Sequence, residues 1–285
     1  MPVLTPNSLA DAVAALAEYP HAVPLAGGTD LMVQVNEGHR RLTGDEMVLA
    51  LGRVPELTSY TIDTEAQLVT LGAAVRWSVV ERDPLKSLLP ALAEAARTVG
   101  SPQIRNAGTV GGNLATCSPA GDGLPVLSAL DARVVLASPG GGRTLPVAEF
   151  MRGVKRTALE PGEMIAAIEV PLLEGWQGYS KVGVRNAMVI ATASACVATD
   201  VRTRSVRIAL GSVAPTIVRA PVAEVLATDA ADWAALTLDP AVAREAGVAA
   251  AAAASPITDH RSTADYRRHA VAVMVERLLL RAFHA

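Results

Sequence analysis

Cysteine and histidine are too few and too scattered to build a metal centre in this chain. The 285 residues include two cysteines, Cys117 and Cys196. Two thiolates cannot by themselves hold an iron–sulfur cluster or a structural zinc ion. The five histidines show no ligand spacing; they are His21, His39, His260, His269 and His284. We therefore expect no metal site here.

Export signals and long apolar runs are also lacking. The first residues, MPVLTPNSLADA, have neither the basic start nor the apolar centre of a secretory signal. We expect a cytoplasmic protein with two free, buried thiols. No stretch of eighteen apolar residues occurs, and the richest tract, GVAAAAAAS at 247–255, favours a helix over a membrane span.

An excess of positive charge is absent as well. The net charge is −3, which argues against nucleic acid as a partner because phosphate binding needs clustered Lys and Arg. Hydrophobic residues nevertheless make up 51% of the chain, and the mean hydropathy is +0.31. Two explanations stay open: apolar faces covered by other subunits, or alanine enrichment in a high-GC genome.

The common nucleotide-binding signatures are missing, but two glycine-rich segments are present. No GxGxxG and no Gly-Lys pair occurs, which excludes a Rossmann site and a P-loop. PLAGGTDLM (24–32) and GTVGGN (108–113) lie about 80 residues apart. Glycines let a ligand approach the backbone, and free amides at a helix start favour a phosphate. One such turn is usually only a tight turn. Two of them favour a clamp on a pyrophosphate, with the amides of Gly108, Gly111 and Gly112 exposed.

Hydrophobic periodicity indicates a mixed α+β chain. We expect a first helix capped by Asn7 or Ser8, a hairpin turning near 63–66, and one amphipathic helix over 84–98 that runs into a glycine loop. The tract SPGGGRTLP is expected to be a glycine turn. Beyond a boundary near 172–178, three strands are expected, in GYSKVGVR, VIATASACVATDV and SVRIALGSVAP. Two helices, 239–254 and 263–284, are expected to close the chain.

Several segments resemble, in order and spacing, the FAD-binding subunit of molybdenum hydroxylases, which include xanthine dehydrogenase and carbon monoxide dehydrogenase. They are LAGGTDL, IRNAGTVGGNLATCSPAGDGLPVLSALDA, FMRGVKRTALEPGEMIAAIEVP and YSKVGVR, and the likeness spans essentially the whole chain. The resemblance implies a vanillyl-alcohol-oxidase (PCMH) type FAD-binding domain at 1–172. Its two α/β subdomains would cover about 1–53 and 54–172. A C-terminal domain at 173–285, with a three-stranded antiparallel sheet and helices, would follow.

The same resemblance implies a set of FAD-binding residues. They are Pro24, Leu25, Ala26, Gly27, Gly28, Thr29, Asp30, Leu31, Val99, Thr109, Val110, Gly111, Gly112, Asn113, Asp122, Ile165 and Lys181. The two glycine segments would cradle the pyrophosphate, and Asp122 would hydrogen-bond the ribityl or ribose region. Ile165 would pack near the flavin–adenine side, and Lys181 would lie beside the isoalloxazine. Val99 replaces an aromatic residue of the animal enzymes.

The residues alone leave some roles open. Asp30 either caps the following helix or touches FAD. Lys181 is either a solvated charge at a strand end or a cation that stabilises reduced flavin. Arg185 is either a partner of an acidic side chain or part of an acceptor channel. Cys117 is expected to be a packed thiol, and no catalytic acid–base residue is expected.

The function that the resemblance implies is electron transfer. A partner large subunit would hold the molybdopterin cofactor and a small subunit would hold [2Fe–2S] clusters, in a dimer of heterotrimers. FAD in this chain would pass electrons to an external acceptor, such as NAD. The substrate, for which purines are the mild preference, would bind another chain. The alternative is an autonomous flavin-dependent oxidase or reductase of the same fold.

Overall fold

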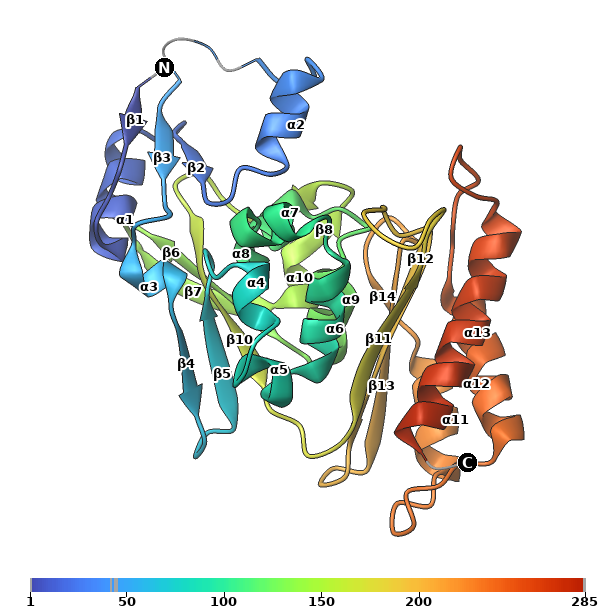
Figure 1. Ribbon diagram of the computed structural model, residues 1–285. Coiled ribbons are helices and arrows are strands. Elements are labelled where there is room, and N and C mark those ends of the chain that lie inside the picture. Colours follow the sequence, from blue (N-terminus) through green and yellow to red (C-terminus); the bar gives the residue numbers. More distant parts are fainter. Residues whose placement is uncertain (1, 42, 44–45, 284–285) are drawn as a thin grey trace.

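The computed structural model describes residues 2–41, 43 and 46–283. Figure 1 shows successive layers, from a small N-terminal sheet through a larger sheet, a group of helices and a second antiparallel sheet to the C-terminal helices. The small sheet is parallel, in the order β1 (Val3–Leu4), β3 (Val48–Ala50), β2 (Val23–Leu25). Helix α1 (Leu9–Glu18) begins at Ser8, whose Oγ accepts from the N–H of Asp11 at 3.0 Å, so the predicted capped helix is confirmed.

The larger sheet is antiparallel and has the order β4-β5-β10-β6-β7. Its strands are β4 (Tyr60–Asp63), β5 (Leu68–Gly72), β10 (Met164–Pro171), β6 (Arg133–Ser138) and β7 (Gly141–Pro146). The predicted hairpin is confirmed, and Asp63 fixes its turn by accepting from the N–H groups of Glu65 and Ala66. The expected glycine turn is present at 139–140 but is shorter than predicted, because the rest of the tract forms β7, an edge strand that is too exposed to show hydrophobic alternation.

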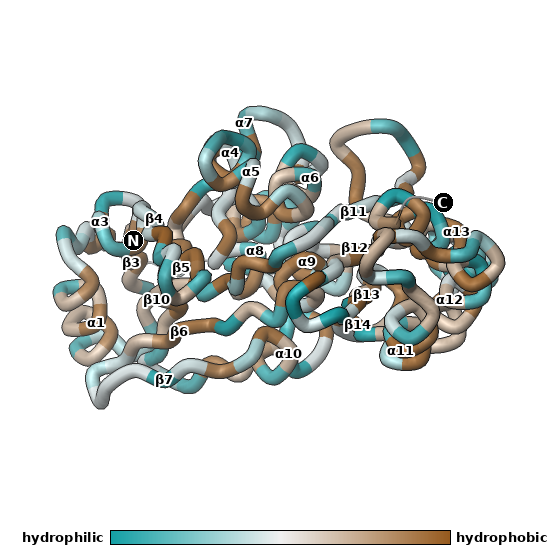
Figure 2. The backbone as a smooth tube through the Cα atoms, turned by 90° about the horizontal axis from the view of Figure 1, so that it is seen from below, coloured by the Kyte–Doolittle hydropathy of each residue, from teal (hydrophilic) through white to brown (hydrophobic). Residues whose placement is uncertain are grey.

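The middle of the chain forms short helices, most of which lie between this sheet and the next one (Figure 1). They are α3 (Pro55–Thr58), α4 (Trp77–Val80), α5 (Leu85–Leu88), α6 (Pro90–Thr98), α7 (Pro102–Ala107), α8 (Val110–Thr116), α9 (Gly123–Ala129) and α10 (Val147–Phe150). The single helix expected over 84–98 is wrong, because Pro90 has no N–H to continue α5 and instead starts α6. Hydrophobic residues follow β6 and the helices at the middle of the molecule (Figure 2).

The C-terminal sheet contains β11 (Gln177–Val182), β12 (Ala193–Asp200), β13 (Ser205–Gly211) and the short β14 (Val218–Arg219). The three predicted strands are confirmed, with β14 as a fourth. Every residue of β12 is buried: Ala195 and Val197 pack in a core with the C-terminal helices, whereas Cys196 and Ala198 pack toward α6 and α9. This period-two alternation shows that the sheet is covered on both faces.

Three helices cover the outer face of this sheet: α11 (Pro221–Ala230), α12 (Pro240–Ala253) and α13 (Ala264–Ala282). The last two confirm the predicted helices, except that residue 284 of the predicted range lies outside the described residues. Helix α11 was not predicted. Throughout the described part of the chain, no helix combines the length and the apolar character needed to cross a membrane. The remaining elements are α2 (Leu31–Asn36) and the two-stranded β8 (Met151–Gly153) and β9 (Arg156–Thr157).

Candidate cofactor-binding site

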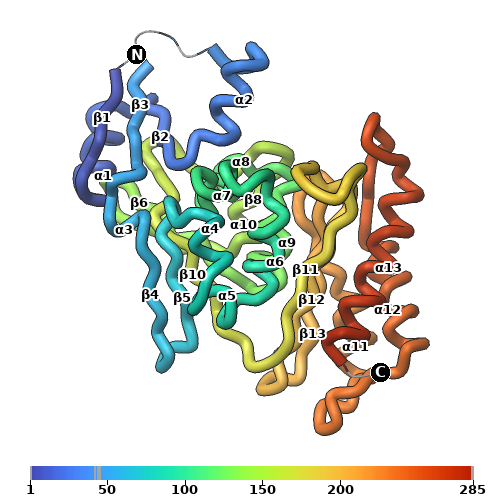
Figure 3. The backbone as a smooth tube through the Cα atoms, viewed as in Figure 1, coloured from blue at the N-terminus to red at the C-terminus, as the bar shows by residue number. Residues whose placement is uncertain are grey.

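A cleft of about 620 Å³ opens between the segment from β2 to α2, the helix α8 with the loop that follows it, and a loop of the C-terminal sheet. Figure 3 shows the turn from β2 to α2 passing over α7 and α8. Most of the predicted residues line this cleft. They are Pro24, Leu25, Ala26, Gly27, Gly28, Thr29, Asp30, Leu31, Val99, Thr109, Gly112, Asn113 and Asp122. Segments that are distant in sequence thus share one cavity.

The turn from β2 to α2 offers unpaired backbone donors. The N–H groups of residues 27–31 donate to no acceptor within the described ranges, and these residues are half-buried along the cleft. Gly28 adopts φ +69°, which favours glycine. Asp30 stands at the N-cap position of α2 but makes no capping bond, and its carboxylate instead accepts from Gln34. The turn is therefore a curved row of donors suited to an anion.

The second glycine segment is folded differently from what we expected. It is helical, and Thr109 caps α8 by accepting from the N–H of Gly112 at 3.0 Å. The N–H groups of Val110 and Gly111 donate to the carbonyls of Val75 and Ala73, at 3.0 and 2.9 Å, and that of Gly108 donates to Ile104. The expectation of free amides here is wrong, because the helix cap and the segment after β5 use them.

Gly111 also does not line the cleft. A Cβ at this position would lie 2.5 Å from the carbonyl oxygen of Ala73, so the absence of a side chain serves internal packing. Gly27 is constrained in a similar way, since its Cβ would lie 2.1 Å from the carbonyl oxygen of Ala107. Because these two positions have no side chain, α8 can approach the segment after β5, and the turn after β2 can approach the end of α7. These close approaches shape the walls of the cleft.

Asn113 supplies what the second segment offers to a ligand. Its side chain lines the cleft, and its Oδ1 is buried without a hydrogen-bond partner among the described residues. A buried, unpaired amide oxygen costs free energy unless a ligand or water donates to it. Asn113 is therefore prepared to bind a donor that enters the cleft.

Asp122 belongs to a buried polar network at the inner wall. Its Oδ1 accepts from the hydroxyl of Tyr179 at 2.9 Å and its Oδ2 accepts from Nζ of Lys181 at 2.8 Å. Burial raises the pKa of Asp122 above its ordinary value, although Lys181 and Tyr179 both oppose this shift. Burial and the nearby carboxylate raise the pKa of Tyr179 well above 10.0, so the phenol keeps its proton.

Lys181 does not line the cleft, and its side chain is 8% exposed. Besides Asp122, its ammonium group donates to the carbonyls of Thr98 and Val189, both at 3.0 Å. All three N–H donors are thus used. The alternative of a solvated strand-end lysine is wrong, and Lys181 contacts the lining residue Asp122 directly.

The remaining predicted residues are placed as follows. Val110 is fully buried beside the helix cap, and Ile165 is 6% exposed within the sheet core, so neither lines the cleft. Arg185 is exposed and donates to the carbonyls of Ala187 and Met188 in its own loop. Cys117 and Cys196 are buried and unpaired, and burial raises the pKa of both thiols.

Sequence reasoning missed several lining residues. They are Val23, Gln34, Arg40, Trp77, Ala115, Thr116, Ser118, Ala120, Gly121, Lys155 and Ile190. Lys155 and Ser118 lie within the quoted motifs, which was a usable signal. Ile190 follows the YSK motif by a loop whose path no local pattern indicates. In the described part of the chain, no three His, Cys, Asp or Glu residues are grouped to hold a metal ion.

Two family models match the chain. The FAD binding domain in molybdopterin dehydrogenase matches residues 1–173, and the CO dehydrogenase flavoprotein C-terminal domain matches residues 179–282. The carbon monoxide dehydrogenase medium chain of Hydrogenophaga pseudoflava is 34% identical over 286 residues, covering 96% of this chain and 94% of the relative. The glyceraldehyde dehydrogenase medium chain of Sulfolobus acidocaldarius is 30% identical, with coverage of 94% and 93%.

Two further similarities extend this result. The xanthine dehydrogenase FAD-binding subunit of Escherichia coli O157:H7 is 29% identical, covering 98% of this chain and 94% of the relative. The solved structure of carbon monoxide dehydrogenase from Hydrogenophaga pseudoflava superposes with a TM-score of 0.85 at 31% identity, covering 99% of this chain and 96% of that one. The likeness therefore includes both sheets and the C-terminal helices.

Proposed function

The chain belongs to the family of FAD-binding medium subunits of the molybdenum hydroxylases, and we propose that it is the electron-transfer subunit of a complex whose substrate is oxidised on another chain. Bound FAD would supply the redox chemistry, since a flavin exchanges electrons singly or in pairs. The chain's own residues would bind and orient the cofactor.

The cleft fits the phosphate part of FAD. The free N–H groups of residues 27–31 would donate to pyrophosphate oxygens, and Asn113 would accept from or donate to the same ligand. Lys155 lines the cleft and would supply positive charge for a phosphate, and Arg40 lines it too but is paired with Glu46. Asp122 would accept from ribityl or ribose hydroxyls, because each carboxylate oxygen has room for a second hydrogen bond.

The composition of the cleft favours electron transfer over autonomous oxidation. No His, Cys or Tyr is among the described residues that line it, and its one buried acid, Asp122, is already bonded to Lys181 and Tyr179. A substrate-oxidising site needs a group that takes a proton. This composition is the observation that carries the proposal.

The relatives support placing the substrate elsewhere. Proteins named for carbon monoxide, glyceraldehyde and xanthine dehydrogenation align with more than nine tenths of this chain, at 29% to 34% identity. We propose a molybdenum-cofactor large subunit and a [2Fe–2S] small subunit as partners, in a dimer of heterotrimers. We also propose the domain division at 1–172 and 173–285; the second hydrophobic core consists only of residues after this boundary, while one face of the C-terminal sheet packs in the first core.

The test uses the full chain alone and with its neighbouring subunits. The isolated chain should release FAD on acid denaturation, oxidise none of the relatives' substrates, and pass electrons from dithionite to an acceptor such as NAD. The co-purified complex should contain molybdenum and iron, and substrate should bleach its flavin band. Turnover of substrate by the single chain would instead support the autonomous oxidase.

A further inference from the structure

Ser212 links two segments that border the cleft. It follows β13 and adopts φ +62°, a left-handed conformation that is uncommon outside glycine. Its N–H donates to the carbonyl of Pro119 at 2.8 Å, and its Oγ donates to the carbonyl of Ala191 at 2.8 Å. Pro119 is flanked by two lining residues, Ser118 and Ala120, and Ala191 follows the lining residue Ile190. Ser212 thus ties two parts of the cleft wall to one point.

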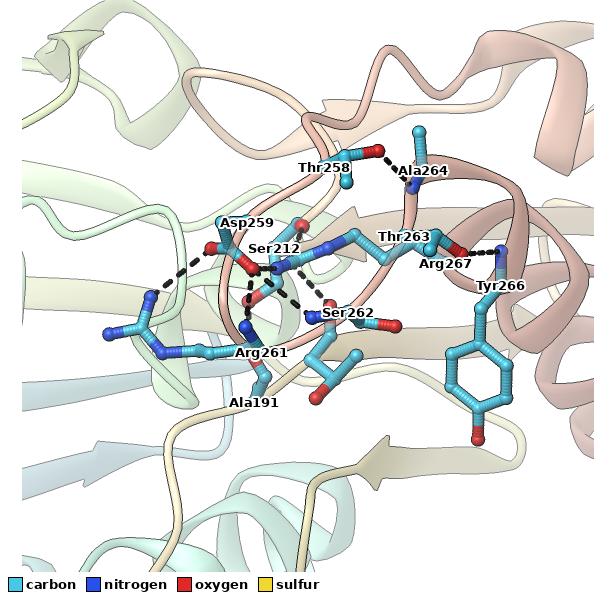
Figure 4. Close-up of polar contacts among 11 residues, drawn as sticks. Ala191, Ser212, Thr258, Asp259, Arg261, Ser262, Thr263, Ala264, Tyr266 and Arg267 are labelled. Carbon is cyan, nitrogen blue, oxygen red and sulfur yellow. Dashed lines mark hydrogen bonds and ion pairs between the residues drawn. The ribbon is translucent and has the colours of Figure 1, made fainter.

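Arg267 of α13 holds this junction from behind. Its Nη1 donates to the carbonyls of Ser212 at 2.9 Å and Thr192 at 2.7 Å, and its Nη2 donates to Asp259 at 2.7 Å (Figure 4). The residue is 4% exposed, and its Nε has no partner among the described residues. Burying a guanidinium costs free energy unless the group is paired. The contacts of Arg267 therefore indicate a structural or functional role for this residue.

Asp259 pairs with Arg267 and orients its side chain. Burial raises the pKa of Asp259, but hydrogen bonds from the N–H of Arg261 and from Arg267 outweigh this effect and lower the pKa to about 2. The carboxylate also accepts from the N–H of Ser262 at 3.2 Å and from Nη1 of Arg261 at 3.3 Å. The loop before α13 therefore places an ionised carboxylate against the Arg267 side chain.

The loop between β11 and β12 needs such support. Val184, Met188 and Ile190 in this loop are 53% or more exposed, so little packing holds it. Lys181 anchors it at the carbonyl of Val189, while Ser212 and Arg267 anchor the next carbonyls, of Ala191 and Thr192. The cleft wall at Ile190 is consequently fixed by hydrogen bonds from both sides.

We propose that Arg267 and Ser212 are positioning residues of the FAD site: from outside the cleft, they hold the Ser118–Asp122 segment and Ile190 where the cofactor binds. This inference rests on the cofactor site of the proposed function. It makes the C-terminal helix α13 part of the machinery that sets cofactor affinity, although no residue of α13 lines the cleft.

The first experiment titrates FAD into the flavin-stripped full chain with Arg267→Gln, well below its melting temperature. Arg268→Gln is the matched control, since Arg268 is the next residue of α13 and its one side-chain partner in the structure is the exposed Asp265. We expect the FAD dissociation constant to rise about tenfold for Arg267→Gln and to stay unchanged for Arg268→Gln. The visible band of the remaining bound flavin should shift, because the wall that contacts it moves.

Ser212→Gly separates positioning from folding. Glycine accepts the left-handed φ without strain, so thermal stability should be kept, while the Oγ bond to Ala191 is lost. We expect an FAD dissociation constant about threefold higher at unchanged melting temperature. Wild-type affinity in both Ser212→Gly and folded Arg267→Gln would overturn the inference and leave electron transfer standing. A wild-type chain that binds no FAD would overturn both.

Discussion

The two glycine segments of the cleft have similar sequences and opposite roles. In the turn from β2 to α2, the N–H groups of residues 27–31 have no acceptor among the described residues, and these residues line the cavity. In the segment from 108 to 113, the protein itself uses the N–H groups of Gly108, Val110, Gly111 and Gly112. The first segment provides donors to a ligand, whereas the second provides shape and one side chain, Asn113. A glycine pair therefore does not by itself indicate free amides.

The largest effect should come from Gly111→Ala. Its Cβ would lie 2.5 Å from the carbonyl oxygen of Ala73, so α8 must move away from the segment after β5. We expect a loss of about 3 kcal/mol in the free energy of unfolding, at the upper end for overpacking. Urea denaturation of the flavin-free chain measures it.

Gly112→Ala is the matched control for this prediction. Gly112 lines the cleft, and its Cβ would meet only the Thr109 side chain, at 2.9 Å. This variant should lose less stability and more FAD affinity than Gly111→Ala. Equal stability losses in the two variants would show that the packing role assigned to Gly111 is mistaken.

The sequence predicted the elements far better than the use of their polar groups. The Ser8 cap and the hairpin at Asp63 depend on residues within a few positions, so local patterns predict them. The amides of the second segment pair with Ala73 and Val75, more than thirty residues away. Lys181 and Asp122 pair across 59 positions. No period or propensity records such contacts, so the sequence predicted residues that mostly line one cleft but wrongly predicted free amides in the second segment.

Asn113→Leu tests the one side chain that the second segment offers. Removing a buried, unpaired amide in favour of an apolar group of similar size should keep or raise the stability of the flavin-free chain. The FAD dissociation constant should rise about tenfold, because a hydrogen bond to the ligand is lost. Chemical denaturation and FAD titration on the same samples check the direction of the change in stability and in FAD dissociation constant. Reduced stability with unchanged affinity would assign Asn113 to the core instead.

Gly28→Ala tests the first segment, with Gly38→Ala as its control. Both glycines have a left-handed φ, +69° and +73°, so each alanine should cost about 1 kcal/mol of stability. Gly28 lines the cleft and Gly38 does not. We therefore expect FAD affinity to fall about threefold in Gly28→Ala alone, measured by fluorescence titration. If both variants lost affinity equally, the row of donors would have no special role.

The smallest effect, and the one that depends on pH, should come from Tyr179→Phe in β11, where the hydroxyl donates to Asp122. The pKa of Asp122 is raised above its ordinary 3.8 by burial, and the Tyr179 hydroxyl opposes this rise. The folded chain thus holds a proton more readily than the unfolded one, so the free energy of unfolding falls as pH rises from below 3.8 through the folded pKa. Losing the hydroxyl raises that pKa further and makes the fall larger.

Near pH 3 the free energy of unfolding of the variant should depend on pH as that of wild type does. The variant's loss of stability relative to wild type should be about 1 kcal/mol larger at pH 7 than at pH 3. Urea denaturation across this range measures the difference. Tyr266→Phe, at an exposed tyrosine of α13, should keep the pH dependence of wild type. A pH-independent loss in Tyr179→Phe would mean that its hydroxyl stabilises the fold without acting on the charge of Asp122.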